Sequence, residues 1–356
     1  NRLKLYKGFG EKTQQNVTDS IEFYLKSKGS FLYSQVLPVV SLTQNFFEQL
    51  FPGKRIEISG TFKRQMEIIN ELEFIIEESE TVIEKALQEI EGFEFLEKEN
   101  DCILYKSSAG IKVKIHPANN ADFITKLVRA SSSQEFYTAL TLDYPQLASA
   151  ITATEAEYFS LAGLSAIPSP LRESASIIKL AKNNSLPQLI QPSDIRGIIH
   201  CHSNWSDGSN TVEEMAKAAI DRGLEYLVMS DHSKSAFYAQ GLSEEKIREQ
   251  HHYIDELNIK LAPFKIFKSI ESDILNDGNL DYSNNVLASF DLVIASVHSN
   301  LKMTEEKAMM RLLKAIENPY TTILGHMTGR LLLSRPGYPV NHDAIIDACA
   351  ANNVVI

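Results

Sequence analysis

The chain has 356 residues, of which 44% are hydrophobic, so it is long enough for two or more domains with separate cores. It contains no apolar run long enough to span a membrane, and it does not start like a signal peptide. Its formal net charge of −11 is a poor match to a tight duplex-DNA binder, because such proteins displace counterions with lysine and arginine. The three cysteines are scattered singly, as is typical of a reducing compartment, and we therefore expect a cytoplasmic protein.

The first stretch, residues 1–28, leans basic despite the acidic total. Gly8 and Gly10 precede an amphipathic helical pattern that contains Lys12. A glycine turn that opens a helix exposes backbone N–H groups that can hold a phosphate. This part resembles a helix-hairpin-helix, which grips the DNA backbone without reading sequence, although an ordinary helix connection would look the same. We expect DNA contact through Gly8, Gly10 and Lys12, and a second helix over residues 30–50.

The next two predicted strands carry polar residues typical of a nucleotide site. A strand over residues 56–59 runs into Gly-Thr-Phe-Lys-Arg, residues 60–64. A second strand over residues 70–76 places Glu71 and Glu73 on one face, because side chains alternate along a strand. This pattern resembles the palm motif of family X DNA polymerases, which belong to the nucleotidyltransferase superfamily. The resemblance implies that Thr61 and Arg64 stand at the nucleotide-phosphate positions, and that Glu71 and Glu73 replace two metal-binding aspartates.

A third acidic position of that family is altered in this chain. The later strand reads Gly-Ile-Lys-Val-Lys-Ile-His over residues 110–116, so Lys114 replaces the expected aspartate. Two-metal catalysis needs carboxylates to hold a pair of cations, and an ammonium group would repel them. We therefore expect Lys114 to pair with Glu71 or Glu73. We also expect no Mg²⁺ in the palm and no nucleotide addition.

A different metal signature begins at residue 198. The apolar residues before His200 predict a strand, and His200 and His202 would share a face at its end. Asp207 follows in a turn before a helix that Thr211 would cap. Two imidazoles and a carboxylate suit zinc, manganese or iron. A single His-x-His could equally be a pair of hydrogen-bonded core histidines.

Repetition of the pattern favours the metal site. Predicted strands over residues 224–229, 264–270, 291–297 and 321–325 are each followed by a side chain that can bind metal. Those side chains are His232, Glu271, His298 and His326. Helical patterns separate the strands, as in a (β/α) barrel, where chemistry gathers at the carboxyl ends of the strands. We therefore predict one metal centre built by five successive strands.

The order of these segments resembles the bacterial family X DNA polymerases that end in a PHP (polymerase and histidinol phosphatase) domain. The resemblance implies about two to three divalent cations, with Glu271 bridging two of them. It also implies that Asp231 orients a ligand imidazole, and that Arg330 and Arg335 are candidates to grip a substrate phosphate. Surface charge or a structural salt bridge is the alternative for both arginines. The implied metal ligands are His200, His202, Asp207, His232, Glu271, His298 and His326.

The expected fold is α/β throughout: a helix-hairpin-helix with a nucleotidyltransferase palm and thumb, then a distorted (β/α)7 TIM-like PHP barrel. The expected boundaries are 1–50 for the hairpin and fingers, 51–120 for the palm, 121–185 for a thumb-like part, 186–193 for a linker and 194–356 for the PHP domain. A last Asp-x-His pair of the family would lie beyond Ile356, and we expect the sequence to be a piece of a longer protein.

The resemblance implies a DNA repair enzyme that hydrolyses phosphoesters with divalent metals, as a 3′–5′ exonuclease on DNA. DNA would be held by its backbone, and the sequence indicates no membrane partner. Two alternatives stay open. One is a PHP phosphatase that acts on a small phosphomonoester, as histidinol-phosphate phosphatases do. The other is a DNA-binding scaffold without catalytic activity.

Overall fold

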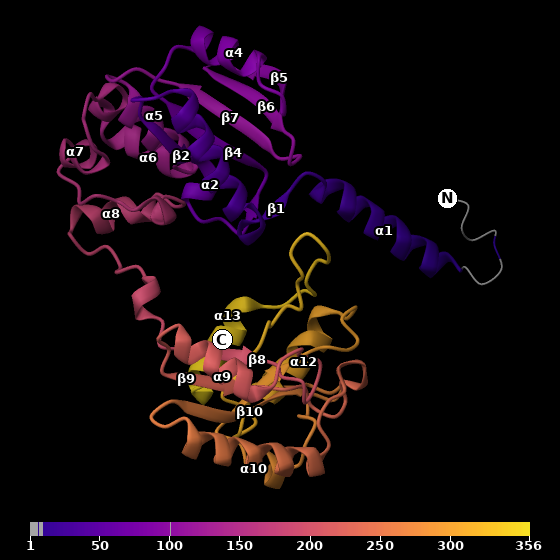
Figure 1. The fold of residues 1–356 in the computed structure, drawn as a ribbon. Coiled ribbons are helices and arrows are strands. Elements are labelled where there is room, and N and C mark those ends of the chain that lie inside the picture. Colours follow the sequence, from indigo (N-terminus) through magenta and orange to yellow (C-terminus); the bar gives the residue numbers. More distant parts are fainter. Residues whose placement is uncertain (1–5, 7–9, 100) are drawn as a thin grey trace. The chain divides into compact units, whose positions relative to one another are not determined.

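The computed structural model describes residue 6, residues 10–99 and residues 101–356. The chain divides into two compact units, one formed by residues 1–188 and 332–334 and one formed by residues 189–331 and 335–356 (Figure 1). Both units are mixed α/β structures with buried apolar clusters of their own. No helix among the described residues is long and apolar enough to cross a membrane.

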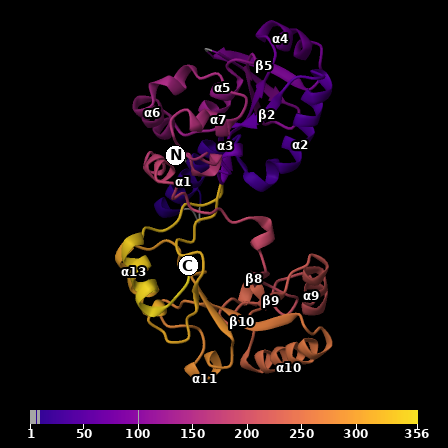
Figure 2. The same ribbon diagram turned by 90° about the vertical axis from the view of Figure 1, so that its left-hand side faces the viewer.

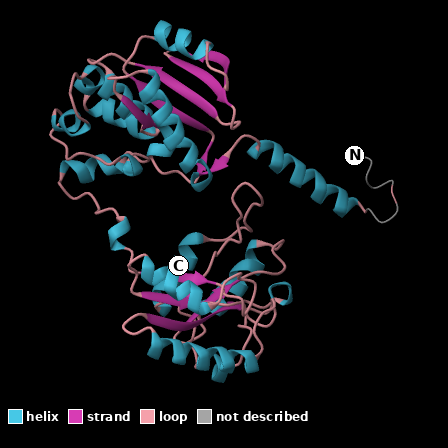
Figure 3. Ribbon diagram, viewed as in Figure 1, coloured by secondary structure: helices cyan, strands magenta, loops and turns pink. Residues whose placement is uncertain are grey.

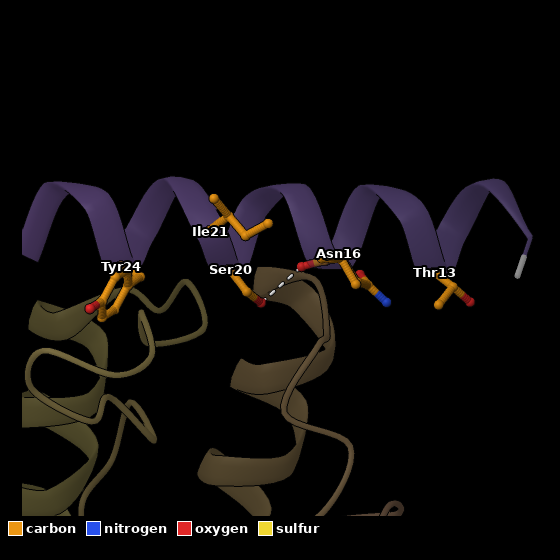
Figure 4. Close-up of a pocket in the computed structure, with 6 residues that line it drawn as sticks. Thr13, Asn16, Ser20, Ile21 and Tyr24 are labelled. Carbon is orange, nitrogen blue, oxygen red and sulfur yellow. Dashed lines mark hydrogen bonds between the residues drawn. The ribbon is translucent and has the colours of Figure 1, made fainter. Parts of the chain in front are cut away.

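The first unit begins with α1 (Glu11–Ser27), which has no buried residue and takes Gly10 as its N-cap. Figure 4 shows a hollow along α1 with Thr13, Asn16 and Ser20 at its edge, where the Ser20 hydroxyl donates a 2.8 Å hydrogen bond to the Asn16 carbonyl. After β1 (Phe31–Leu32) comes α2 (Tyr33–Leu50). Because Gly8 lies outside the described residues, the helix-hairpin-helix stays a prediction.

A five-stranded sheet is the centre of the first unit, and its order is β2 (Ile56–Ser59), β4 (Glu71–Ile76), β7 (Lys112–Pro117), β6 (Cys102–Ser107) and β5 (Phe93–Glu99). β4 and β7 are parallel and the other neighbours are antiparallel. A short β3 (Ile68–Ile69) pairs with β1. The helices are α3 (Gly60–Lys63), α4 (Glu80–Gln88), α5 (Phe123–Ala130), α6 (Gln134–Asp143), α7 (Glu155–Ser160) and α8 (Ser176–Lys182), drawn cyan in Figure 3.

Alternation along β4 separates the core from the polar face of this sheet. Leu72, Phe74 and Ile76 are fully buried in a cluster with residues of α2 and α4. The side chains between them point to the opposite face, where Glu71 and Glu73 lie together and Ile75 is buried in a second apolar cluster. The burial of one face therefore fixes where the two carboxylates lie.

The second unit contains a parallel sheet whose strand order follows the chain: β8 (Gly197–Cys201), β9 (Tyr226–Met229), β10 (Lys265–Asp273), β11 (Leu292–Ser296) and β12 (Ile323–Leu324). Figure 2 shows β8, β9 and β10 side by side with α9 and α10 beside them. The helices of the unit are α9 (Val212–Asp221), α10 (Glu244–Lys260), α11 (Asn284–Leu287), α12 (Glu305–Ile316) and α13 (His342–Asn352). Val355 adds a parallel bridge to Ile323. The described strands thus form an open half-barrel, and a closed (β/α)7 barrel stays a prediction.

Two features of the sequence explain how this sheet and its helices form. Its strands are apolar and packed on helices, as in parallel sheets that are covered by helices. The helices start at defined caps, and α9 carries the predicted one: the Thr211 hydroxyl accepts from the Glu214 amide, and the Glu214 carboxylate accepts from the Thr211 amide. Because all five strands run the same way, their carboxyl ends lie at one edge. That edge carries the candidate site.

Candidate metal centre

The carboxylate of Glu271 is the centre of the candidate site. Glu271 lies near the end of β10 and is only 1% exposed. Its Oε1 atom lies 3.0 Å from His200 Nε2 and 3.2 Å from His298 Nε2. The same oxygen lies 3.0 Å from His326 Nε2. Three strands, β8, β11 and β12, therefore bring one imidazole each to a single oxygen atom.

The second oxygen of the same carboxylate faces two further imidazoles. Glu271 Oε2 lies 3.2 Å from His232 Nδ1 and 3.5 Å from His202 Nε2. Both rings also approach Asp207, whose oxygens lie 3.8 Å from His202 Nδ1 and 3.7 Å from His232 Nε2. The structure thus brings all seven predicted ligand side chains into one cluster.

The histidines of β8 reach this cluster by a route that simple strand alternation does not describe. The pairing of β8 with β9 shifts register between Ile198 and Cys201, and His200 adopts a positive φ of 63°. Such a conformation is uncommon for a residue with a side chain and is typical of constrained functional sites. The following loop is equally tight, because a Cβ atom at Gly208 would meet the His202 carbonyl oxygen at 2.2 Å. A glycine there lets Asp207 turn back toward His202.

Hydrogen bonds set the charge of the cluster. Burial alone would raise the pKa of Glu271, but hydrogen bonds from His200, His298 and His326 outweigh burial and hold that pKa far below its usual range. Burial would lower the pKa of His298, whereas hydrogen bonds to Asp273 and Glu271 raise it to about 9. Burial lowers the pKa of His232. Glu271 is therefore a carboxylate at neutral pH.

The donor set fits divalent metal ions. Three groups have ligand atoms within 4.8 Å of one another: His200, His202 and Glu271; His202, Asp207 and His232; and His232, Glu271 and His298. Among the described residues, the buried Nδ1 atoms of His202 and His232 have no hydrogen-bond partner, and the 3.2 Å approach of His232 Nδ1 to Glu271 Oε2 is a charge contact without hydrogen-bond geometry. A buried imidazole nitrogen without a hydrogen bond is costly, and coordination to a cation would satisfy it. Mixed imidazole and carboxylate ligands suit zinc, manganese or iron.

The carboxylate that orients an imidazole is Asp273, and the prediction that Asp231 does so is wrong. Asp231 is fully buried and accepts hydrogen bonds from the Ser203 amide and hydroxyl, the Ser206 hydroxyl and the Gln250 amide. It therefore fixes the loop after β8. Asp273 Oδ1 instead bonds the Nδ1 atom of His298. The sequence held a signal for this, because Asp273 follows Glu271 by two residues on the same strand and so shares its face.

The two arginines proposed for substrate phosphate lie on the exposed segment after β12. Arg335 Nε and Nη2 donate to the Gly329 carbonyl at 3.1 and 3.0 Å. These contacts, with the backbone bridge between Leu331 and Arg335, close a loop. The Arg330 side chain is exposed, and its amide donates to the Thr328 hydroxyl at 3.4 Å. The structure thus gives Arg335 a structural contact and leaves phosphate binding by either arginine a proposal.

In the first unit, the acidic face of the sheet is neutralised by the chain itself. Lys114 Nζ lies 2.7 Å from Glu71 Oε1 and 3.8 Å from Glu99 Oε2. Burial works to lower the pKa of Lys114, but the hydrogen bond and charge of Glu71 raise it. His116, which sequence reasoning missed, lies two residues further along β7 with its Nε2 atom 3.2 Å from Glu73 Oε2. Each carboxylate thus has a basic partner. Of the two carboxylates with which Lys114 was expected to pair, the structure shows Glu71.

The two predicted phosphate-binding side chains have other surroundings. Arg64 Nε donates to Glu173 Oε1 at 2.5 Å, and Arg64 Nη1 donates to the Ser132 carbonyl at 3.2 Å. Thr61 Oγ1 is buried and makes no hydrogen bond to the described residues. A guanidinium already paired with a carboxylate would have to exchange that partner for a nucleotide phosphate. Among the DNA-backbone candidates, Gly10 caps α1 and Lys12 is exposed on its first turn, whereas Gly8 lies outside the described residues.

Comparison with known proteins agrees with this geometry. Residues 199–347, which contain the whole cluster, match the PHP domain. The chain is also 28% identical over 370 aligned residues to the DNA polymerase/3'-5' exonuclease PolX of Bacillus subtilis, a match that covers 98% of this chain. The chain spans 64% of the length of that relative. The predicted resemblance to bacterial family X DNA polymerases with a C-terminal PHP domain is thereby confirmed.

Other relatives match a shorter part of the chain. A probable phosphatase of Thermoanaerobacter sp. is 29% identical over 157 residues, which cover 42% of this chain and 58% of that protein. A probable phosphatase of Clostridium novyi is 27% identical over 167 residues, 44% of this chain and 62% of that protein. The matches to phosphatases thus cover less than half of this chain, whereas the match to the Bacillus protein covers nearly all of it.

We predict that Asp273→Asn weakens metal binding about tenfold to a hundredfold, the effect typical of removing a partner that orients a ligand histidine. The amide keeps the size of the side chain but loses the negative charge that makes His298 a stronger donor. Competition with a chromophoric chelator would measure the affinity for Zn²⁺ and Mn²⁺. An unchanged affinity would show that Asp273 does not support the centre. Asp277→Asn, at an exposed turn, is the matched control.

Proposed function

We propose that this chain is a metal-dependent phosphoesterase whose PHP domain trims DNA from the 3′ end during repair, and whose palm no longer adds nucleotides. The observation that carries the proposal is the convergence of five imidazoles and Asp207 on the buried carboxylate of Glu271. Such a cluster at the carboxyl ends of parallel strands is typical of an active site. The match to a protein named as a DNA polymerase and 3'-5' exonuclease supports DNA as the substrate.

In this proposal the seven side chains hold two to three divalent cations, with Glu271 shared between the two sides of the cluster. His200, His298 and His326 serve the side of Oε1, and His202, His232 and Asp207 serve the side of Oε2. When bound, the cations acidify water and neutralise charge on the phosphate oxygens. The protein contributes the fixed geometry, since Asp231 holds the loop of His202 and Asp273 holds His298.

The first unit would position DNA in this scheme. We propose that residues 51–120 are a palm and residues 121–185 a thumb, with residues 1–50 forming a helix-hairpin-helix that contacts the DNA backbone through Gly10 and Lys12, and with residues 186–193 linking this part to the PHP domain. The Lys114–Glu71 and His116–Glu73 pairs support loss of polymerase activity, because they occupy the carboxylates that two Mg²⁺ ions need.

One prediction concerns the palm alone. Lys114→Asp removes the ammonium group and adds a carboxylate beside Glu71, so we expect the variant to bind about one more Mn²⁺ per chain than the wild type. Titration followed by electron paramagnetic resonance would count the ions, with both proteins also carrying His202→Ala to weaken the PHP centre. Lys106→Asp, an exposed position on β6, is the control of equal charge and should gain none. Primer extension by the wild type would contradict the proposal of a disabled palm.

A second prediction concerns hydrolysis. With Mn²⁺ present, the wild type should shorten end-labelled DNA from its 3′ end. His202→Ala should lower the rate more than about a hundredfold, because removing a metal ligand costs more than removing a residue that only orients one. His252→Ala, an exposed histidine of α10, should retain the wild-type rate. Gel analysis of the products measures both.

The probable phosphatases among the relatives support one alternative, a phosphatase for a small phosphomonoester. The same preparations should therefore be given a small phosphomonoester and tested for phosphate release. Release from that ester without shortening of DNA would favour the alternative. If the His202→Ala variant still shortened the DNA at the wild-type rate, the PHP centre would not be the site of hydrolysis.

A further inference from the structure

Two adjacent aromatic side chains are exposed beside the metal centre. Phe237 is 88% exposed and Tyr238 is 71% exposed, on the short helical turn Phe237–Ala239 that follows β9. Exposure of one large apolar side chain is ordinary, but two neighbouring exposed rings at the rim of an active site indicate a contact surface. We call residues 233–241 the aromatic loop.

The aromatic loop begins directly after His232, and Tyr238 returns to the cluster. The rings of Tyr238 and His232 have centroids 6.0 Å apart at an angle of 61°. Tyr238 thus contacts a side chain of the metal centre, and the neighbouring Phe237 is exposed to solvent.

Hydrogen bonds that are partly or fully buried tie this loop to the rest of the unit. The Ser235 amide and hydroxyl both donate to the carboxylate of Asp281, at 2.6 and 2.5 Å. The Lys234 amide donates to the Tyr282 hydroxyl at 3.0 Å, and that hydroxyl donates to the Leu242 carbonyl at 2.5 Å. The exposed rings therefore stand on a fixed base, which lowers the entropy lost when a ligand binds.

The two ends of the loop also pack closely. A Cβ atom at Gly241 would meet the Ser233 carbonyl oxygen at 1.8 Å, so a glycine is needed for the approach. Gln240 adopts a positive φ of 55° to make the turn. The Ser233 hydroxyl accepts from the Asp273 amide at 2.9 Å, which ties the loop to the strand of Glu271. The aromatic loop is therefore connected by hydrogen bonding to the strand that carries Glu271.

We propose that the aromatic loop is a stacking platform for the bases of a single DNA strand, with Phe237 and Tyr238 holding the nucleotides next to the phosphodiester at the Glu271 cluster. Every base has a π face, so stacking on exposed aromatic rings holds single strands without reading sequence. Lys234, an exposed residue of the same loop whose ammonium group lies 5.0 Å from the centroid of the Tyr282 ring, adds a positive charge to the loop. This inference rests on the proposed function and narrows its substrate to base-bearing strands.

The test compares two oligonucleotides with the same sugar–phosphate backbone, one normal and one with abasic residues at its 3′ end. In the presence of Mn²⁺ the wild type should cleave the normal strand about tenfold faster at low concentration, in line with the usual stacking energy per base. Phe237→Leu should lose this preference, because leucine keeps the apolar side chain but removes the ring. Phe237→Tyr should keep it. Ile259→Ala, which removes another exposed apolar side chain, should also keep it.

A second readout does not depend on turnover. A phosphorothioate strand with 2-aminopurine at its 3′ end loses fluorescence when that base stacks on an aromatic ring. The wild type and Phe237→Tyr should quench it, and Phe237→Leu should quench it clearly less. Equal cleavage of both strands by the wild type, or full quenching by Phe237→Leu, would overturn the platform. Absence of cleavage of either strand would overturn the proposed function instead, and the fluorescence would still decide whether the base stacks.

Discussion

The second unit depends on one constraint, which is the burial of a negative charge at Glu271. An ionised carboxylate that is 1% exposed has lost most of its hydration and needs compensation from the protein. Five imidazoles from the ends of four neighbouring strands surround it, and the hydrogen bonds of His200, His298 and His326 keep Glu271 ionised. The positive φ of His200, the tight turn at Gly208 and the Asp273–His298 bond all bring ring nitrogens to that carboxylate. Among the residues that the structure describes, the buried Nδ1 atoms of His202 and His232 make no hydrogen bond, and in the proposed function a cation would satisfy this cluster.

The first unit also holds carboxylates close together, but there basic side chains of the chain itself pair with them. Glu71 and Glu73 lie together on the polar face of β4, where two like charges would repel each other. Lys114 and His116, on the neighbouring parallel strand, supply a basic partner for each carboxylate. An ammonium group is a permanent substitute for a metal, whereas an imidazole is a metal ligand when neutral. We therefore propose that the two carboxylate sites differ in what they can bind, because an ammonium group already occupies Glu71.

Much of this arrangement could be predicted from the sequence, because strands, caps and the residues that end strands are local features. The five strand ends, the Thr211 cap and the pairing of Lys114 with either Glu71 or Glu73 followed from periodicity, chemistry and resemblance. Contacts between distant residues could not be read in this way. Arg64 meets Glu173 across 109 positions, and nothing local in the sequence indicates that pair. Asp231 and Asp273 both stand beside a ligand, and only the fold shows that Asp231 faces serines while Asp273 faces an imidazole. The shifted register of β8 likewise depends on its pairing with β9.

The central claim is that cations bind at Glu271 and not at Glu71 and Glu73. Anomalous diffraction from crystals of the full chain grown with Mn²⁺ tests it most directly, because the peaks locate each ion. The account predicts peaks within about 2.0–2.6 Å of the Glu271 carboxylate and the surrounding imidazoles, at ordinary coordination distances. It predicts none between β4 and β7. A peak between Glu71 and Glu73, or none beside Glu271, would contradict it.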